Sequence, residues 1–264
     1  MNGALRVRVG VHDGKSHVAE SYAHAPYHYL PLIPRDRDFP LLTIVNSSGG
    51  ILGGDELDAR IELDAHAGVM LRQQAATKVY RSIAGPARSF CHFVLGEGAW
   101  LDYFPDEIIP FAGSAYAQTT RVELAPDAGM LLGELVTAGR LARGERFAFT
   151  RLTLDVQCAA GDALLLRDRA DLEPARQQLE NPAMLGDATL WGAFYLLTTA
   201  PVDATLADDI DEILGAATDG WGGASLAPSG IVGRVVGTSL DAVRTAFQLA
   251  RTCVLDRFPV GGRG

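Results

Sequence analysis

The chain has 264 residues, of which 48% are hydrophobic and 21% charged, a composition that predicts a folded protein with its own core and argues against disordered or fibrous classes. Its 23 lysines and arginines and 32 aspartates and glutamates give a formal net charge of −9 at pH 7. This charge opposes binding to nucleic-acid phosphates and to anionic membranes, so we expect neither among its partners.

The cysteines and the apolar segments indicate the compartment in which the chain works. Cys91, Cys158 and Cys253 are an odd number, and no pair has the C-x-x-C spacing of redox or zinc motifs. The first ten residues alternate charged and aliphatic side chains and lack the apolar core of a signal peptide. The longest apolar run, residues 188–202, is shorter than the roughly 20 residues of a membrane span. We therefore expect a cytoplasmic protein.

The N-terminal segment has the pattern of a β-hairpin. Aliphatic residues from Leu5 to Val11 alternate with charged ones, and Asp13-Gly14 then supplies a two-residue turn before residues 16–19. We predict two short antiparallel strands here.

A glycine followed three residues later by leucine recurs four times at nearly equal spacing. These glycines are Gly68, Gly98, Gly129 and Gly161, separated by 30, 31 and 32 residues, and an apolar alternating stretch precedes each. Such a period is typical of stacked supersecondary units, here two strands joined by a turn at the glycine. It favours a solenoid-like stack of strands and leaves open a series of ordinary hairpins in a β-sandwich.

The pattern becomes helical near the C-terminus. Residues 205–217 begin with a capping-box pattern, Thr205-x-x-Asp208, and place their apolar residues on one face. Residues 239–256 begin at Ser239 and repeat apolar residues every three or four positions. The apolar stripe of this second helix either docks on the chain's own strands or binds a partner.

These elements combine into one predicted fold. The fold class is mainly β, a helical or solenoid-like stack of strands with two α-helices near the C-terminus. We expect a single domain over residues 1–264, with strands at about 1–200, before the first helix, and at about 220–237, between the two helices.

Catalytic and metal-binding motifs are incomplete in this sequence. Residues 10–16 have one residue too few between the glycines for a phosphate-binding loop, and a strand follows instead of a helix. His24 and His28 have a suitable spacing for a metal, but Pro26 between them disfavours the helix that would align them. We therefore predict no catalytic residues, no enzyme activity and no permanently bound cofactor.

Glu134 breaks a local rule of strand patterning. In residues 130–136 it shares the period-2 face with methionine, leucine and valine, and a buried carboxylate is costly unless it is paired. One interpretation is an internal ion pair with the arginines of residues 139–146. The other is a polar lining inside the stack, where Glu134, Asp55 and Glu56 supply oxygen ligands to a passing cation.

Four sequence blocks, in order along the chain, resemble the urease accessory protein family UreD, also called UreH. They are residues 48–57 (SGGILGGDEL), residues 74–82 (QAATKVYRS), residues 105–111 (PDEIIPF), and residues 133–135 (GEL) together with 139–147 (GRLARGERF).

The resemblance implies both a fold and a function. The implied fold is a β-helical stack with two C-terminal helices. The implied function is non-catalytic: a maturation factor that binds the urease apoprotein and, with the accessory protein UreF and the GTPase UreG, supports GTP-dependent nickel insertion. Nickel would pass transiently through an internal polar tunnel. The alternative function is a generic β-stack protein-binding module without a role in metal transfer.

We assign residues to these roles as a hypothesis. Five carboxylates are expected along the nickel path: Asp55, Glu56, Glu107, Glu134 and Glu145. Four further residues of the blocks are expected to stabilise the fold through internal hydrogen bonds and ion pairs: Lys78, Tyr80, Arg81 and Arg140. We expect the isolated chain to show neither turnover nor tight nickel binding.

Overall fold

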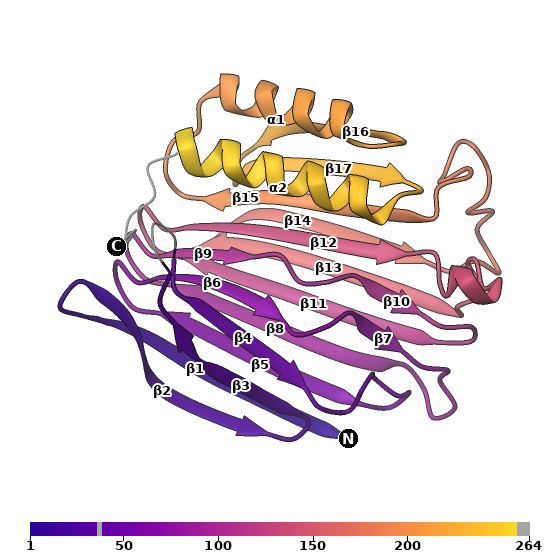
Figure 1. The fold of residues 1–264 in the computed structure, drawn as a ribbon, viewed down its shortest axis with the longest axis horizontal. Helices are drawn as coiled ribbons and strands as arrows, with labels where there is room; N and C mark the ends of the chain where they lie inside the picture. Colours follow the sequence, from indigo (N-terminus) through magenta and orange to yellow (C-terminus); the bar gives the residue numbers. More distant parts are fainter. Residues whose placement is uncertain (36–38, 258–264) are drawn as a thin grey trace.

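The computed structural model describes residues 1–35 and 39–257 and consists mainly of strands in two sheets (Figure 1). The seven-stranded sheet has the order β14 (Ala163–Leu172), β13 (Arg151–Ala160), β11 (Ala115–Leu124), β8 (Ala87–Leu95), β5 (Glu56–Leu63), β1 (Asn2–His12) and β2 (Lys15–His24). The ten-stranded sheet has the order β16 (Trp221–Ala227), β17 (Gly230–Gly237), β15 (Leu190–Thr198), β12 (Gly129–Thr137), β9 (Trp100–Tyr103), β6 (Gly68–Gln73), β4 (Leu41–Asn46) and β3 (Tyr27–Ile33). Two short strands, β7 (Thr77–Val79) and β10 (Ile108–Pro110), pair with each other, and β10 also pairs with β12.

The chain passes repeatedly from one sheet to the other, as a solenoid does. β5, β8 and β11 of the seven-stranded sheet are each followed by a strand of the ten-stranded sheet: β6, β9 and β12. In this part of the chain, neighbouring strands of the same sheet are therefore parallel: β5, β8, β11 and β13 in one sheet, and β4, β6, β9 and β12 in the other. The crossover through the opposite sheet returns the chain in the same direction. The predicted solenoid-like stack is confirmed.

The glycine repeat marks three of these crossovers but not the fourth position. Gly68 and Gly129 are the first residues of β6 and β12, and Gly98 lies in the turn before β9. Gly161 instead lies in the tight turn that joins β13 to β14, which pair antiparallel within one sheet. The prediction of a stacked unit at Gly161 is wrong, because a two-residue hairpin returns the chain to its own sheet.

The N-terminal hairpin has the predicted turn, but its strands are longer than predicted, with 11 and 10 residues. β1 and β2 pair antiparallel with His12 opposite Lys15, so that Asp13 and Gly14 form the turn. Both turn residues have a positive φ, which this turn type requires.

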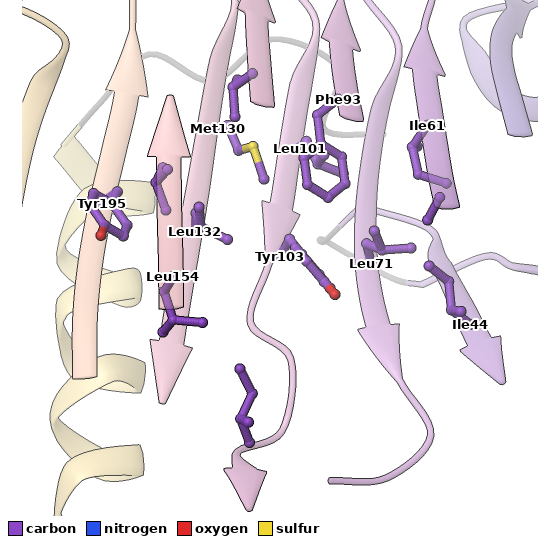
Figure 2. Packing of buried hydrophobic residues seen from close by; sticks show 14 of the residues in the cluster. Ile44, Ile61, Leu71, Phe93, Leu101, Tyr103, Met130, Leu132, Leu154 and Tyr195 are labelled. Atoms are coloured by element: carbon purple, nitrogen blue, oxygen red, sulfur yellow. The ribbon is translucent and has the colours of Figure 1, made fainter. Parts of the chain in front are cut away.

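The main hydrophobic core lies between the two sheets. Side chains at alternate positions of both sheets meet there, and Figure 2 shows part of this core. Phe93 of β8 and Tyr103 of β9 lie side by side in it, with ring centroids 5.4 Å apart. Most side chains between the sheets are apolar, so the polar side chains that enter this layer are candidates for a function.

Two helices, α1 (Ala204–Ala217) and α2 (Leu240–Arg257), pack on the other face of the ten-stranded sheet, at the end formed by β15, β16 and β17 (Figure 1). The apolar stripe of α2 is buried against this sheet, and Phe247 packs on Phe194 of β15 with ring centroids 5.9 Å apart. The stripe therefore docks on the chain's own strands, as the first of its two interpretations predicts. No helix among the described residues is long and apolar enough to cross a membrane.

The start of α1 differs from the predicted capping box. The N-cap is Asp203, whose Oδ1 accepts a hydrogen bond from the Thr205 main-chain nitrogen at 3.0 Å. Aspartate is a stronger N-cap than threonine, so the helix begins one residue before Thr205. Before α2, Ser239 acts as predicted, because its hydroxyl accepts from the Ala242 nitrogen at 3.2 Å.

Candidate functional site

Glu134 lies in the middle of β12 and points into the layer between the sheets. Residues of β12 alternate between the two faces: Met130 and Leu132 belong to the core between the sheets, whereas Leu131 and Leu135 pack toward the helices. Glu134 shares the Met130 face. Only 6% of it is exposed, so its carboxylate is withdrawn from water inside an otherwise apolar strand face.

The arginines that follow β12 do not neutralise Glu134, and the internal ion-pair interpretation is wrong. Arg140 binds Glu145, with Nε 2.8 Å from Oε2, and Arg146 donates to main-chain carbonyls and to a surface glutamate. Both arginines come after the strand has ended, so their side chains reach its edge rather than its interior. Glu134 accepts a hydrogen bond from the Gln118 amide of β11 at 3.1 Å, and no ion pair with it occurs among the described residues.

A second carboxylate, Asp168 of β14, lies beside Glu134. Both line a small cavity of about 50 Å³, together with Tyr195 of β15 and Arg234 of β17. The Tyr195 hydroxyl donates to Asp168 Oδ2 at 2.6 Å, and Arg234 forms an ion pair with the same oxygen. The Arg234 guanidinium also lies over the Tyr195 ring, 5.5 Å from its centroid.

Strand register brings this group together. In the ten-stranded sheet Glu134 lies opposite Ala193, and Ala193 lies opposite Arg234, so these three residues form one row across β12, β15 and β17. In the other sheet Asp168 lies opposite the core residue Val156, which places Asp168 on the inner face. The two sheets thus present their charged residues to one another.

The environment of Glu134 favours its protonated form. Burial raises the pKa of Glu134 to about 7, the negative charge of Asp168 adds to this increase, and the Gln118 amide opposes it. At neutral pH this carboxyl group therefore exchanges readily between its neutral and charged forms. An oxygen ligand of this kind binds a divalent cation weakly.

A larger cavity of about 120 Å³ continues the polar layer on the other side of Gln118. Its polar lining comes from both sheets and includes Tyr27, Gln73, Ser89, Cys91, Tyr116 and Gln118. The Tyr116 hydroxyl donates to Gln118 Oε1 at 3.1 Å. Gln118 lines this cavity and also binds Glu134, which lines the smaller one, so this pair of side chains lies between the two cavities. Burial raises the pKa of Cys91 to about 12, so its thiol stays protonated at neutral pH.

The five carboxylates assigned to the nickel path do not gather at one place. Asp55 is buried and accepts from the N-terminal ammonium of Met1 at 2.7 Å and from the Leu52 nitrogen at 2.9 Å. Glu56 is exposed and lies 3.8 Å from Arg88 on the outer face of the seven-stranded sheet. Asp55 and Glu56 thus bind partners at the start of β5 and line neither of the two cavities.

Glu107 and Glu145 are also held by arginines. Glu107 is buried and accepts from Arg244 of α2 at 2.6 Å. Glu145 accepts from Arg140, and this pairing lowers its pKa. Of the five carboxylates, Glu134 alone lines either of the two cavities among the described residues. The roles assigned to all five remain predictions.

The four residues expected to stabilise the fold behave differently from one another. Arg140 lies over the Phe111 ring, 4.0 Å from its centroid, and Tyr80 packs edge-on against the same ring at 5.0 Å. Lys78 and Arg81 are exposed, and neither side chain forms a hydrogen bond or ion pair within residues 1–35 and 39–257. The expected internal bonds of Lys78, in β7, and of Arg81, two residues after β7, are therefore not made.

The remaining candidate metal ligands are dispersed. Cys91 and His92 point to opposite faces of β8, as strand alternation predicts: Cys91 lines the larger cavity and His92 lies 3.2 Å from Glu123 on the outer face. No group of three or more histidine, cysteine or acidic side chains suited to a metal ion occurs in the described part of the chain.

Sequence reasoning missed Gln118, Asp168, Tyr195 and Arg234 as parts of the site. Asp168 and Arg234 carry the same signal as Glu134, since each is a charged residue on an apolar strand face. The alternation could have identified them as inward-facing residues. Their meeting with Glu134 depends on strand register and was not available from local patterns.

Comparison with known proteins decides the family of this chain. A sequence model of the family described as "UreD urease accessory protein" matches residues 1–259. The chain belongs to the UreD urease accessory protein family. Relatives named "Urease accessory protein UreD" include that of Herpetosiphon aurantiacus, 36% identical over 216 residues that cover 78% of this chain and 75% of the relative. Those of Paracoccus denitrificans and Haloarcula marismortui are 36% and 32% identical over 234 and 265 residues, covering 86% and 95% of this chain and 79% and 86% of the relatives.

In this member of the UreD family, two of the motif blocks border the larger cavity. Gly49 and Gly50 come from the first block and residues 74–78 from the second. Main-chain hydrogen bonds join the blocks, since the Ile51 nitrogen donates to the Lys78 carbonyl at 2.8 Å. A Cβ at Gly50 would lie 2.2 Å from the Tyr80 ring, so glycine is required there. The resemblance based on these blocks is confirmed.

Proposed function

We propose that this protein is a non-catalytic urease maturation factor. It binds the urease apoprotein and acts with UreF and the GTPase UreG in GTP-dependent insertion of nickel into the urease active site. Membership of the UreD family over residues 1–259 supports this role. We place the activity in the cytoplasm, since Cys91, Cys158 and Cys253 are all unpaired.

The observation that carries the metal-transfer part of the proposal is the polar layer between the sheets. The hydrogen-bonded side chains of Gln118 and Glu134 lie between its two cavities, and apolar core surrounds them. A buried carboxylate that lacks an ion pair reduces stability, so a role other than folding explains it best. Nickel is the cargo of this path, and Glu134 is the ligand that we assign to it.

The donor set suits passage rather than storage. Around Glu134 lie the neutral amide of Gln118 and the phenol of Tyr195, and Asp168 is already paired with Arg234. The Glu134 carboxyl group is partly protonated at neutral pH, and its neighbours are neutral oxygen donors. Such a set binds a divalent cation weakly and releases it readily. We therefore expect transient nickel binding and no resident cofactor.

Deletion of the gene in its host tests the maturation role. We expect the deletion strain to accumulate urease with little nickel and little activity, and the wild-type gene to restore both. Affinity purification of the restored protein should recover UreF, UreG and urease subunits. Full urease activity and nickel content in the deletion strain would contradict the proposal. Restored activity without any recovered UreF or UreG would favour a protein-binding module outside metal transfer.

A further inference from the structure

Arg234 stands at the mouth of the cavity that contains Glu134. The exposed fraction of the side chain is 45% for Arg234 and 24% for Asp168, while Glu134 is only 6% exposed. The three charged groups are therefore ordered from the solvent inward. A cation that approaches Glu134 from this side meets the Arg234–Asp168 ion pair first.

The surrounding residues hold Arg234 over the cavity. In the row across the sheet, the small residue Ala193 separates Arg234 from Glu134 and leaves space above it. The guanidinium donates to its own sheet at the Gly233 carbonyl, 2.9 Å away, and pairs with Asp168 of the opposite sheet. The Tyr195 ring lies beneath the guanidinium, so Arg234 bridges the two sheets across the opening.

The charges at this mouth are unequal in number. Glu134 and Asp168 supply two carboxylates, and Arg234 is the cation among the charged residues that line the cavity. Arginine cannot lose its proton in a protein, so Arg234 stays positively charged at every accessible pH. Without it, two carboxylates and the Tyr195 hydroxyl would face one small cavity and would attract a divalent cation.

We propose that Arg234 is a displaceable counter-ion that keeps the affinity of the Asp168–Glu134 pair for divalent cations low. A divalent cation reaches Glu134 through this mouth by replacing the guanidinium at Asp168, and Arg234 returns when the cation leaves. Arg234 is thus a residue that sets the strength of cation binding. The identification of the cation as nickel rests on the function proposed above, whereas the counter-ion role does not.

Nickel binding to the purified full chain tests this role without urease or its partners. We expect Arg234→Gln to bind one Ni²⁺ about tenfold more tightly than the wild type. A neighbouring opposite charge lowers the affinity of a carboxylate for a proton by about this factor, and its removal should raise the affinity for Ni²⁺ similarly. Arg234→Lys retains the positive charge and should stay within about threefold of the wild type. Isothermal titration calorimetry with NiSO₄ at pH 7.5 measures both.

A matched control separates the local effect from the change in net charge. Arg169 is also 45% exposed and pairs with Asp155 and Asp171 on the outer face of the seven-stranded sheet. Arg169→Gln should bind Ni²⁺ as the wild type does. Adding Glu134→Gln to Arg234→Gln should abolish the gain. The inference is overturned if folded Arg234→Gln protein binds Ni²⁺ no more tightly, or if the gain survives removal of the Glu134 charge.

The outcome is independent of the maturation test. If the deletion strain has a urease defect but Arg234→Gln leaves nickel affinity unchanged, the proposed function stands and the counter-ion role fails. If Arg234→Gln tightens binding but the deletion strain makes fully loaded urease, the counter-ion role stands and the proposed function fails.

Discussion

The Glu134→Gln variant should be more stable than the wild type by about 3 kcal/mol at pH 7.5 and nearly equal to it at pH 4. The pKa of Glu134 is about 7 in the folded protein, against an ordinary value of 4.5. The difference between these values corresponds to the predicted change in the free energy of unfolding. Glutamine is nearly isosteric and carries no charge to desolvate.

The sign of the effect follows from proton binding. Below pH 4.5 the carboxyl group is protonated in both the folded and the unfolded chain and contributes no difference between them. As the pH rises from 4.5 to 7, the unfolded chain loses this proton while the folded chain retains it. The folded state therefore becomes less stable across this window, and the loss is complete above the folded pKa of about 7. The glutamine variant has no such loss.

Urea unfolding of both proteins at pH 4, 6 and 7.5 measures this difference. Glu123→Gln is the control, because Glu123 lies on the outer face of the other, seven-stranded sheet and is 39% exposed. Its stability relative to the wild type should change little between pH 6 and 7.5. The prediction is contradicted if the free energies of unfolding of Glu134→Gln and the wild type differ by the same amount at all three pH values. Ionisation of Glu134 would then not reduce the stability of the folded protein.

Asp102→Ala should lower the free energy of unfolding by about 3–5 kcal/mol. The Asp102 side chain of β9 is fully buried and forms ion pairs with Arg72 of β6 and Arg251 of α2. Only 12% of the Arg251 side chain is exposed. Removal of the carboxylate leaves two largely buried guanidinium groups without this counter-ion, and it also removes a link between α2 and the sheet.

Asp106→Ala provides the comparison, because Asp106 pairs with another arginine of α2 at the surface. Asp106 and Arg244 are 40% and 44% exposed, and Arg244 keeps its contact with Glu107 in the variant. The expected loss is about 0–1 kcal/mol. Denaturant unfolding of both variants at neutral pH measures the two losses. Equal losses in the free energy of unfolding would contradict the prediction, because they would mean that the buried Asp102 ion pairs contribute no more to stability than the exposed Asp106 pair.

The sequence was informative where a structure depends on local periodicity. Alternation along residues 130–136 predicted that Glu134 faces the core, and the roughly 30-residue glycine period predicted a stack that crosses between layers. Both patterns reflect geometry that repeats along the chain, so each can be read from the sequence without knowing which distant residues pair. The apolar stripe from Leu240 to Val254 likewise determined which face of α2 is buried.

Pairings between distant residues could not be predicted in the same way. Asp55 binds the N-terminus, 54 residues away, and Glu107 binds Arg244, 137 residues away. The motif blocks give the positions of such carboxylates in the sequence, but the partners of these carboxylates come from strands and helices that meet only in the folded protein. Chemical type alone therefore grouped residues that the structure separates.

The meeting of Glu134 with Asp168 and Arg234 depends on two further features. The first is the register between β12, β15 and β17, which sets the row that contains Glu134 and Arg234. The second is the way the seven-stranded sheet packs on the ten-stranded sheet, which brings Asp168 over that row. Neither feature has a signal in a single short segment.

The nickel content of urease tests most directly whether the polar layer carries nickel. Urease would be purified from the deletion host complemented with wild type, Glu134→Gln or the Glu123→Gln control, and its nickel measured by atomic absorption. We predict less nickel with Glu134→Gln, with UreF, UreG and urease co-purifying as in the wild type. Because this variant should be more stable than the wild type, unfolding would not explain the loss. Urease fully loaded by Glu134→Gln would contradict the assignment of the nickel path to this layer.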